Sequence, residues 1–370
     1  MIRRNLLAGV CLLAALASWP ARAGDGPGGD DGAGDGGLVY TMTNAAASNS
    51  VMVYRQSAGG SLSPLGAVST GGQGSGGGLG SQGSLVLSNS RRWLLAVNAG
   101  SDDVSVLRAS ESGLTLASKT PSGGRMPIGV AVSGRIVYVL NAGMPNNITG
   151  FLLDNNGGLS PIANSTRPLS TPSAGPAQIQ FSADGDHLVV TEKATNLIDV
   201  FPLVGLVPGP RVASVSHGMT PFGFAFGNHD RVFVSEAFGG APNASAASSY
   251  SLLANDMLHV ISGSVGTTQT AACWLVIDPS GRFAYTTNTG SRTVSVFGIG
   301  QDGSLTAGAS LASTPAGGPI DATFSAGGRF LHVLTANAAT IVTFRIQSNG
   351  SLQVVGTVSA PPAAAGLAAQ

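Results

Sequence analysis

The sequence is poor in charge and in cysteine, and it shows no long helical periodicity. Only 10% of its 370 residues are charged, and 18 basic residues balance 18 acidic ones. So weak a charge does not provide the basic surface with which proteins bind nucleic acid or anionic membranes. We therefore expect no nucleic-acid partner and no membrane partner for the mature chain.

Residues for metal or nucleotide chemistry are also scarce. There are two cysteines and five histidines, and no group of His, Cys and carboxylates has the spacing of zinc ligands. No serine lies in a G-x-S-x-G pattern. The glycine-rich run Gly71–Gly80 is not part of a strand–helix–strand unit, so it does not predict a dinucleotide site.

Residues 1–23 have the pattern of a cleavable signal peptide. Arg3 and Arg4 precede the apolar run Leu6–Ala17, and the segment ends with the small-x-small pattern before Gly24. The run is too short to span a bilayer as a helix. Cleavage would remove three basic residues, so 15 basic minus 18 acidic residues leaves −3. We expect a secreted or periplasmic protein.

Two further expectations follow from that cleavage. It would remove Cys11 and leave Cys273 alone, so the exported protein would contain no disulfide. The next segment, residues 24–37, reads GDGPGGDDGAGDGG and has the composition of a disordered linker. Its aspartates do not have the spacing of a calcium loop.

Glycine is abundant, and the best-formed part of the chain is Ala272–Leu305. A short apolar strand, Trp274–Ile277, precedes a tight turn, and a second strand, Phe283–Thr287, follows it. Thr293–Phe297 alternates polar and apolar residues as a third strand, and a fourth begins near Leu305. This pattern predicts a four-stranded antiparallel meander.

Weaker copies of this pattern recur along residues 38–370. The residues that end the second strand are separated by 54, 43, 51, 44, 52 and 47 residues, a period typical of propeller blades. These residues are Asn44, Asn98, Asn141, Glu192, Glu236, Asn288 and Thr335. The first copy lacks a first strand, and the C-terminal segment Ala363–Gln370 resembles one. We therefore predict an all-β, seven-bladed propeller, closed by pairing of the C-terminal strand with the N-terminal blade.

The repeat also predicts where a site could lie. The start of each first strand and the end of each second strand share one face of the ring, around the central channel. Asn98, Asn141 and Asn288 occupy this position as candidate ligand-binding residues, although a side chain that caps its own turn is the alternative. Glu192, with Lys193 after it, and Glu236 place charges there instead.

The approaches to the first strands add further polar and aromatic side chains. These candidate substrate-binding residues are Arg125, Gln178, His217, Trp274 and Asp321. With Glu192, Glu236 and Lys193 as candidate catalytic residues, the set could bind a hydroxylated or carboxylated small molecule and move a proton. Alternatively, Glu192 and Lys193 pair with neighbouring blades as structural ions, and Trp274 packs in the channel.

Three segments resemble the lactonase family of seven-bladed propellers, which includes 6-phosphogluconolactonase-like and 3-carboxymuconate cyclase-like proteins. They read FSADGDHLVVTEKATNLIDVF, VFVSEAFGGAPNASAASSYSL and TAACWLVIDPSGRFAYTTNTGSRTVSVF. The resemblance covers Leu38–Gln370. It implies a channel-facing site that opens or closes a sugar-acid or carboxylated lactone without metal or organic cofactor. By position, Glu192, Lys193 and Glu236 are the polar residues that this resemblance implies for the site. Phosphogluconolactonase-like members often have Pro-His where this chain has Pro176-Ala177.

We therefore expect an exported, monomeric lactonase-like hydrolase that acts on a small lactone or carboxylated sugar. Glu192 or Glu236 would act as general base, while Lys193 and Arg125 would stabilise the developing oxyanion. Two alternatives remain open at this point. One is a non-catalytic propeller that binds a ligand or a protein, and the other is a muconate-type cyclase that closes a lactone ring.

Overall fold

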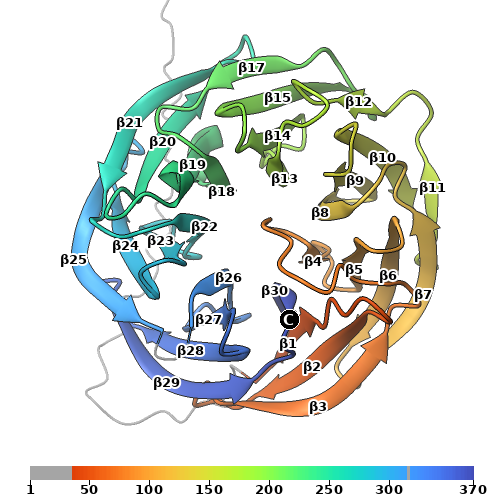
Figure 1. The fold of residues 1–370 in the computed structure, drawn as a ribbon, viewed down its shortest axis with the longest axis horizontal. Helices are drawn as coiled ribbons and strands as arrows, with labels where there is room; N and C mark the ends of the chain where they lie inside the picture. Colours follow the sequence, from red (N-terminus) through yellow and green to blue (C-terminus); the bar gives the residue numbers. More distant parts are fainter. Residues whose placement is uncertain (1–35, 315–316) are drawn as a thin grey trace, which may run out of the picture. The chain divides into compact units, whose positions relative to one another are not determined.

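The computed structural model describes residues 36–314 and 317–370. The expected signal peptide, and the linker as far as residue 35, lie outside the described residues. Within those residues the strands form seven separate antiparallel sheets, which we call blades 1 to 7 and which surround a central channel (Figure 1). No helix in this part of the chain is long and apolar enough to cross a membrane.

The blades follow one another in chain order, apart from one strand. Blade 1 contains β1 (Leu38–Met42), β2 (Ser50–Gln56), β3 (Leu62–Ser69) and β30 (Ala365–Ala369). Blade 2 contains β4 (Leu85–Leu87), β5 (Trp93–Asn98), β6 (Asp103–Ser110) and β7 (Gly113–Pro121). Blade 3 contains β8 (Pro127–Ser133), β9 (Ile136–Asn141), β10 (Asn147–Leu153), β11 (Leu159–Pro161) and β12 (Arg167–Pro168). Blade 4 contains β13 (Pro176–Phe181), β14 (His187–Glu192), β15 (Leu197–Val204), β16 (Val207–Pro208) and β17 (Val212–Val215).

The remaining blades are regular four-stranded sheets. Blade 5 contains β18 (Pro221–Phe226), β19 (Arg231–Glu236), β20 (Ala246–Leu252) and β21 (Leu258–Gly266), with the short 3-10 turns η1 (Asn228–Asp230) and η2 (Phe238–Gly240). Blade 6 contains β22 (Ala272–Ile277), β23 (Phe283–Asn288), β24 (Thr293–Ile299) and β25 (Leu305–Ser313). Blade 7 contains β26 (Pro319–Phe324), β27 (Phe330–Thr335), β28 (Thr340–Ile346) and β29 (Leu352–Ser359).

The predicted closure of the ring is confirmed. β30, from the C-terminus, pairs antiparallel with β1, so that Tyr40 lies opposite Ala368 and Thr41 opposite Leu367. The Thr41 hydroxyl also donates to the carbonyl oxygen of Gly366 at 2.7 Å. Both ends of the described chain therefore complete blade 1, and β1 is paired on both edges, with β2 and with β30.

Blade 6 shows why these sequences form hairpins. The Asp278 carboxylate accepts the backbone N–H groups of Arg282 at 2.9 Å and Phe283 at 2.7 Å, which fixes the turn between β22 and β23. Gly281 has φ +70, a left-handed conformation that glycine adopts without steric cost. The meander predicted over Ala272–Leu305 is thus confirmed strand by strand.

Two faces of the ring matter for function. Pro176 at the start of β13 pairs with Glu192 at the end of β14, and Pro221 pairs with Glu236 in the same way. We call the face that carries these ends the mouth face. The turns between first and second strands, such as the one before His187, lie on the opposite, hairpin face.

Candidate functional site

A long connection between blades 1 and 2 crosses the channel at the mouth face. We call residues 71–84, between β3 and β4, the strap; Figure 1 shows this orange segment reaching into the middle of the ring. The Ser81 hydroxyl donates to the Ile128 carbonyl of blade 3 at 2.8 Å, and the Gln82 N–H donates to the Ala177 carbonyl of blade 4 at 3.0 Å. The strap therefore bridges blades that are far from its own position in the sequence.

The strap is also fixed to blade 6. The Gln82 side chain donates to the Leu275 carbonyl at 2.9 Å and accepts the Leu275 N–H at 3.1 Å. Trp274 donates its indole N–H to the Ser81 carbonyl at 3.1 Å. Gly223 must be glycine here, because a Cβ at this position would lie 2.1 Å from the Gln82 amide oxygen and 2.8 Å from the Cys273 carbonyl oxygen.

These contacts decide which face of the channel is open. Five hydrogen bonds from Ser81, Gln82 and Trp274 would have to break before the strap could leave the mouth. Each such bond contributes about 1 kcal/mol, so together they hold the strap in place. The strap therefore covers the channel at the mouth face.

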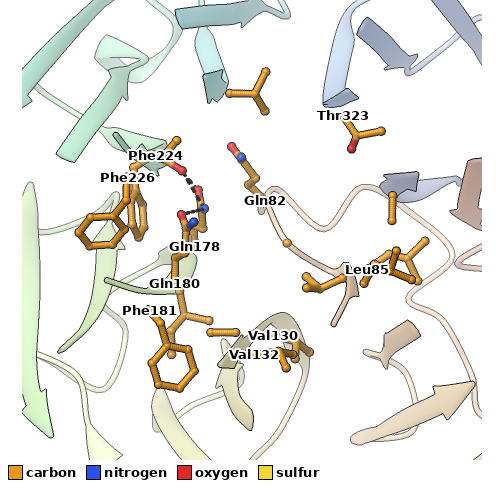
Figure 2. Close-up of a pocket in the computed structure, with 18 of the residues that line it drawn as sticks. Gln82, Leu85, Val130, Val132, Gln178, Gln180, Phe181, Phe224, Phe226 and Thr323 are labelled. Carbon is orange, nitrogen blue, oxygen red and sulfur yellow. Dashed lines mark hydrogen bonds between the residues drawn. The ribbon is translucent and has the colours of Figure 1, made fainter. Parts of the chain in front are cut away.

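Below the strap lies a cavity of about 650 Å³, lined by the first strands of the blades. Figure 2 shows Gln178 and Gln180 together on one side of the cavity, Gln82 projecting from the strap and Thr323 on the other side. Val130 is among the apolar lining residues. The lining continues to Asn89 and Ala183, which are exposed on the hairpin face. The cavity thus combines apolar walls with amides and a hydroxyl, as ligand sites commonly do.

Gln178, predicted as a substrate-binding residue, lines this cavity but also holds blades 4 and 5 together. Its amide oxygen accepts the Phe224 N–H at 2.6 Å, and its amide nitrogen donates to the Phe224 carbonyl at 2.9 Å. The Gln178 side chain therefore joins β13 to β18 with two hydrogen bonds, as the backbone of a neighbouring strand would. Gln180, also on β13, is left to face a ligand in the cavity.

Asp321 also lines the cavity, and it is the one ionisable residue among the described lining residues. Its side chain is buried on β26, and one carboxyl oxygen accepts the Ala322 N–H at 2.8 Å. Burial raises the pKa of Asp321 to about 8, and the backbone hydrogen bonds from Ala322 and Leu367 offset only part of that effect. A carboxyl group with this pKa can gain or lose a proton near neutral pH.

Glu192 is fully buried, and it does not face the channel cavity. Its carboxylate accepts hydrogen bonds from the backbone N–H of Ser170 at 2.9 Å, from the Ser170 hydroxyl and from the Thr195 hydroxyl at 2.5 Å. Burial alone would raise the pKa of Glu192, but hydrogen bonds from Asp199, Ser170 and Thr195 outweigh it and keep the pKa below its ordinary value.

Asp199 adds a second carboxyl group to the Glu192 cluster. Burial and the neighbouring Glu192 raise the pKa of Asp199 to about 7, although Arg211 contacts its carboxylate at 2.7 Å. A carboxyl group with this pKa can hold a proton near neutral pH, which reduces the repulsion between Asp199 and Glu192. The contacts of Glu192 thus lie within blade 4 and the connection that leads into it.

The structure brings two other predicted residues, Glu236 and His217, together. Glu236 is fully buried and accepts the Gly218 N–H at 2.8 Å and the Ser264 hydroxyl at 2.6 Å, as well as a short hydrogen bond from the Ser248 hydroxyl. The exposed His217 lies 3.0 Å from the same Ser264 hydroxyl. Ser264, which links them, was not singled out from the sequence because it lies on the outer strand β21, far from both residues along the chain.

Lys193 lies at the strap. Its amine donates to the Gly80 carbonyl and sits 4.7 Å from the centroid of the Phe222 ring. Phe222 and Trp274 pack against each other with ring centroids 5.0 Å apart, so Trp274 serves as channel packing, as the alternative held. Arg125 is exposed on the mouth face and does not line the cavity.

The three asparagines are buried in hydrogen-bond networks at the ends of their second strands. Asn98 donates to Asp103 at 2.6 Å and to Ser105 at 2.8 Å. Its amide oxygen accepts from Asn49 of blade 1 at 2.9 Å and from Thr70 at 2.7 Å. Asn141 and Asn288 bond in a similar way to neighbours on their own third strands. Their positions fit the capping alternative, and none of the three lines the cavity.

The predicted site residues therefore do not gather at one place. Gln178 and Asp321 line the cavity, Lys193 and Trp274 contact the strap, Glu192 lies in a cluster at blade 4, and Glu236 lies in a cluster at blade 5. Nowhere in residues 36–314 and 317–370 do three His, Cys or acidic residues gather to hold a metal ion. The strap itself could have been suspected from the sequence, since the 54-residue interval between Asn44 and Asn98 is the longest of the repeat.

Similar structures support the fold. A candidate 6-phosphogluconolactonase of Bacteroides uniformis has a TM-score of 0.74 and 18% identity over 91% of this chain and 100% of its own. A second one, from Bacteroides fragilis, has a TM-score of 0.74 and 17% identity over 92% and 100%. The periplasmic gluconolactonase of Pseudomonas aeruginosa has a TM-score of 0.73 and 18% identity over 90% and 98%. At such identities these likenesses show the fold alone.

No curated protein matches the chain. The sequence profile described as "Lactonase, 7-bladed beta-propeller" matches residues 11–172 and 247–370, which is most of the chain. The unmatched segment, 173–246, holds Glu192, Lys193, His217 and Glu236. The matched segments contain the strap, Asp321 and the latch between β1 and β30. With seven blades and this match, the chain belongs to the family of seven-bladed β-propeller lactonases.

Proposed function

We propose that this protein hydrolyses small uncharged lactones in its channel, with Asp321 as the acid–base residue. Membership of the lactonase family supports the reaction class. The observation that carries the proposal is the single ionisable carboxyl group in a cavity of about 650 Å³ that is closed at one end by the strap. Such a cavity is large enough for a small ligand.

The cavity lining favours a neutral substrate. Gln180 and Thr323 offer hydrogen bonds to ring hydroxyl groups, while Val130 and Val132 provide apolar contact (Figure 2). No Lys or Arg is among the described lining residues. A phosphorylated or carboxylated lactone would therefore bring a negative charge next to Asp321 without a counter-charge, which is costly in a buried site. A neutral aldonolactone avoids this cost.

Hydrolysis needs one proton to move. Water attacks the lactone carbonyl carbon, the ring C–O bond breaks, and the proton lost by water ends on the new hydroxyl group. Ionised Asp321 would take the proton from water and then pass it to the leaving alkoxide. A pKa of about 8 suits both steps, because general acid–base catalysis works best when the pKa is near the working pH.

The decisive experiment compares Asp321→Asn with Glu192→Gln on D-glucono-1,5-lactone, with acid release measured above the spontaneous rate. We expect Asp321→Asn to lower kcat by about 10²- to 10⁴-fold and Glu192→Gln to retain activity. For the wild type, kcat/KM should rise as the pH increases through about 8. Loss of activity in Glu192→Gln alone would place the reaction at the mouth face instead.

Two other proposals from the sequence have separate tests. Saturable lactone binding without turnover in the wild type would favour the non-catalytic alternative, which the fully hydrogen-bonded Glu192 and Glu236 support. Incubation with carboxymuconate would reveal ring closure instead of ring opening.

The proposal that the protein is exported rests on the leader pattern and on the likeness to a periplasmic gluconolactonase. The mature N-terminus should be Gly24, and gel filtration should show a monomer.

A further inference from the structure

Asp321 is a buried carboxyl group that lines a cavity without a cation beside it. The residue is only 4% exposed, and its partners Ala322 and Leu367 contribute uncharged backbone N–H groups. Across the residues that the structure describes, Asp321 takes part in no ion pair. The ionised form of Asp321 therefore lacks the counter-charge that buried ions in proteins ordinarily have.

The rest of the cavity does not supply that counter-charge. Its described lining residues include no Lys, Arg or His. The Lys193 amine, at the strap, bonds to the Gly80 carbonyl and is not among the lining residues. Burial raises the pKa of Asp321 to about 8, as expected for a carboxyl group with no cation nearby. A positively charged ligand would stabilise the carboxylate.

The walls of the cavity add hydrogen-bonding groups for such a ligand. Thr323 is two residues from Asp321 on β26, so the two side chains leave the strand on the same side, and both line the cavity. On the other side, the Gln178 amide nitrogen lies 3.4 Å from the Gln180 amide oxygen, which leaves the Gln180 amide nitrogen to donate into the cavity (Figure 2). A primary ammonium group has three N–H donors, enough for a carboxylate and a hydroxyl together.

We propose that the channel cavity binds a small hydroxylated primary ammonium ion, with Asp321 as its counter-ion. The Asp321 carboxylate and the Thr323 hydroxyl accept N–H groups of the ammonium, while Gln180 bonds to a hydroxyl group farther along the ligand. A cavity of about 650 Å³ has room for such a molecule. Its lining continues to the exposed Asn89 and Ala183, which gives the ligand a way in. Binding uses the same cavity as the proposed lactone hydrolysis but does not depend on that reaction.

The test compares two ligands that differ only at one end. D-Glucamine has a primary ammonium group where D-sorbitol has a hydroxyl group. Each is titrated into the full mature protein at pH 8 by isothermal titration calorimetry, and the amine stays protonated because alkyl ammonium groups titrate near about pH 10. We expect D-glucamine to bind at least about tenfold more tightly than D-sorbitol, since close charge pairs in desolvated sites contribute that much or more.

Two variants and one proton measurement assign the preference to Asp321. Asp321→Asn keeps the size of the side chain but removes its charge, so it should bind both ligands equally. Glu192→Gln removes a buried carboxyl group that does not line the cavity, and it should keep the preference. At pH 7 the wild type should release about one proton when D-glucamine binds, because the ligand ionises an Asp321 that is largely protonated at that pH. D-Sorbitol should release none.

Absence of saturable D-glucamine binding, equal affinities of the wild type for the two ligands, or a preference that survives in Asp321→Asn would each overturn the inference. Turnover separates these results from the proposed function. Lactone hydrolysis without a preference for D-glucamine would remove the ammonium site and leave the lactonase proposal standing. A preference for D-glucamine without hydrolysis would do the reverse.

Discussion

The latch between β30 and β1 allows the sharpest test of the fold. Deleting residues 365–370 removes two reciprocal backbone hydrogen bonds between Leu38 and Gln370, at 3.3 and 2.8 Å. It also removes the bonds from Thr41 to Gly366 and from Tyr40 to Gln370, both 2.7 Å, and the rest of the β1–β30 ladder. With about six hydrogen bonds at ~1 kcal/mol each, the polar part alone is about 6 kcal/mol.

Buried apolar surface adds to that loss. Leu367 is 6% exposed and packs in a cluster with Val39 and Tyr54 of blade 1 and with Leu334 of blade 7. Its burial contributes about 2 kcal/mol, so the deletion should cost about 8 kcal/mol. Because a folded domain is stable by only about 5–15 kcal/mol, the truncated protein should be at or near the limit of folding.

The assay is urea denaturation followed by circular dichroism. Leu367→Ala should lower the free energy of unfolding by about 2–5 kcal/mol. Leu311→Ala is the matched control: Leu311 is 48% exposed on the outer strand β25, and its replacement should change stability by less than about 0.5 kcal/mol. If the deletion cost under about 2 kcal/mol, or if the two Leu→Ala variants were equally stable, the latch would not hold the ring.

Three further predictions concern the strap and two buried titratable groups. Gly223→Ala should cost about 1–3 kcal/mol in thermal unfolding, because its Cβ would overlap Gln82, and the double variant with Gln82→Gly should lose less than the sum of the two single losses. Asp321 has a raised pKa, so between pH 4 and about 8 the wild type should lose about 1.4 kcal/mol per pH unit relative to Asp321→Asn; equal pH profiles would contradict this. His332 is buried between Thr343 and Gln56, and burial lowers its pKa to about 4. Relative to His332→Gln, the wild type should therefore lose stability as the pH drops from about 6.5 to 4, and parallel pH profiles would contradict this.

The blade count and the closure of the ring could be predicted from the sequence. These predictions rested on local patterns: the alternation of polar and apolar residues in strands, the turn residues, and the interval between copies. The structure contains the strands that these patterns predicted, as in the meander from β22 to β25. That the C-terminal segment matches the missing first strand can also be recognised from the sequence alone. Apart from β30 in blade 1, strand pairing within a blade joins segments that are close in sequence, and this is why sequence and structure agree.

The tertiary structure alone decided which side chains face the channel. Position at the end of a second strand placed Glu192 and Glu236 on the mouth face, but Ser170, before blade 4, and Ser264, on the outer strand of blade 5, hold their carboxylates away from the cavity. The strap closes the predicted mouth because Gln82 meets Leu275, which is 193 residues away in the chain. Buried polar groups go where hydrogen bonds can be satisfied, and those partners come from the packing of the whole ring, which no local pattern encodes.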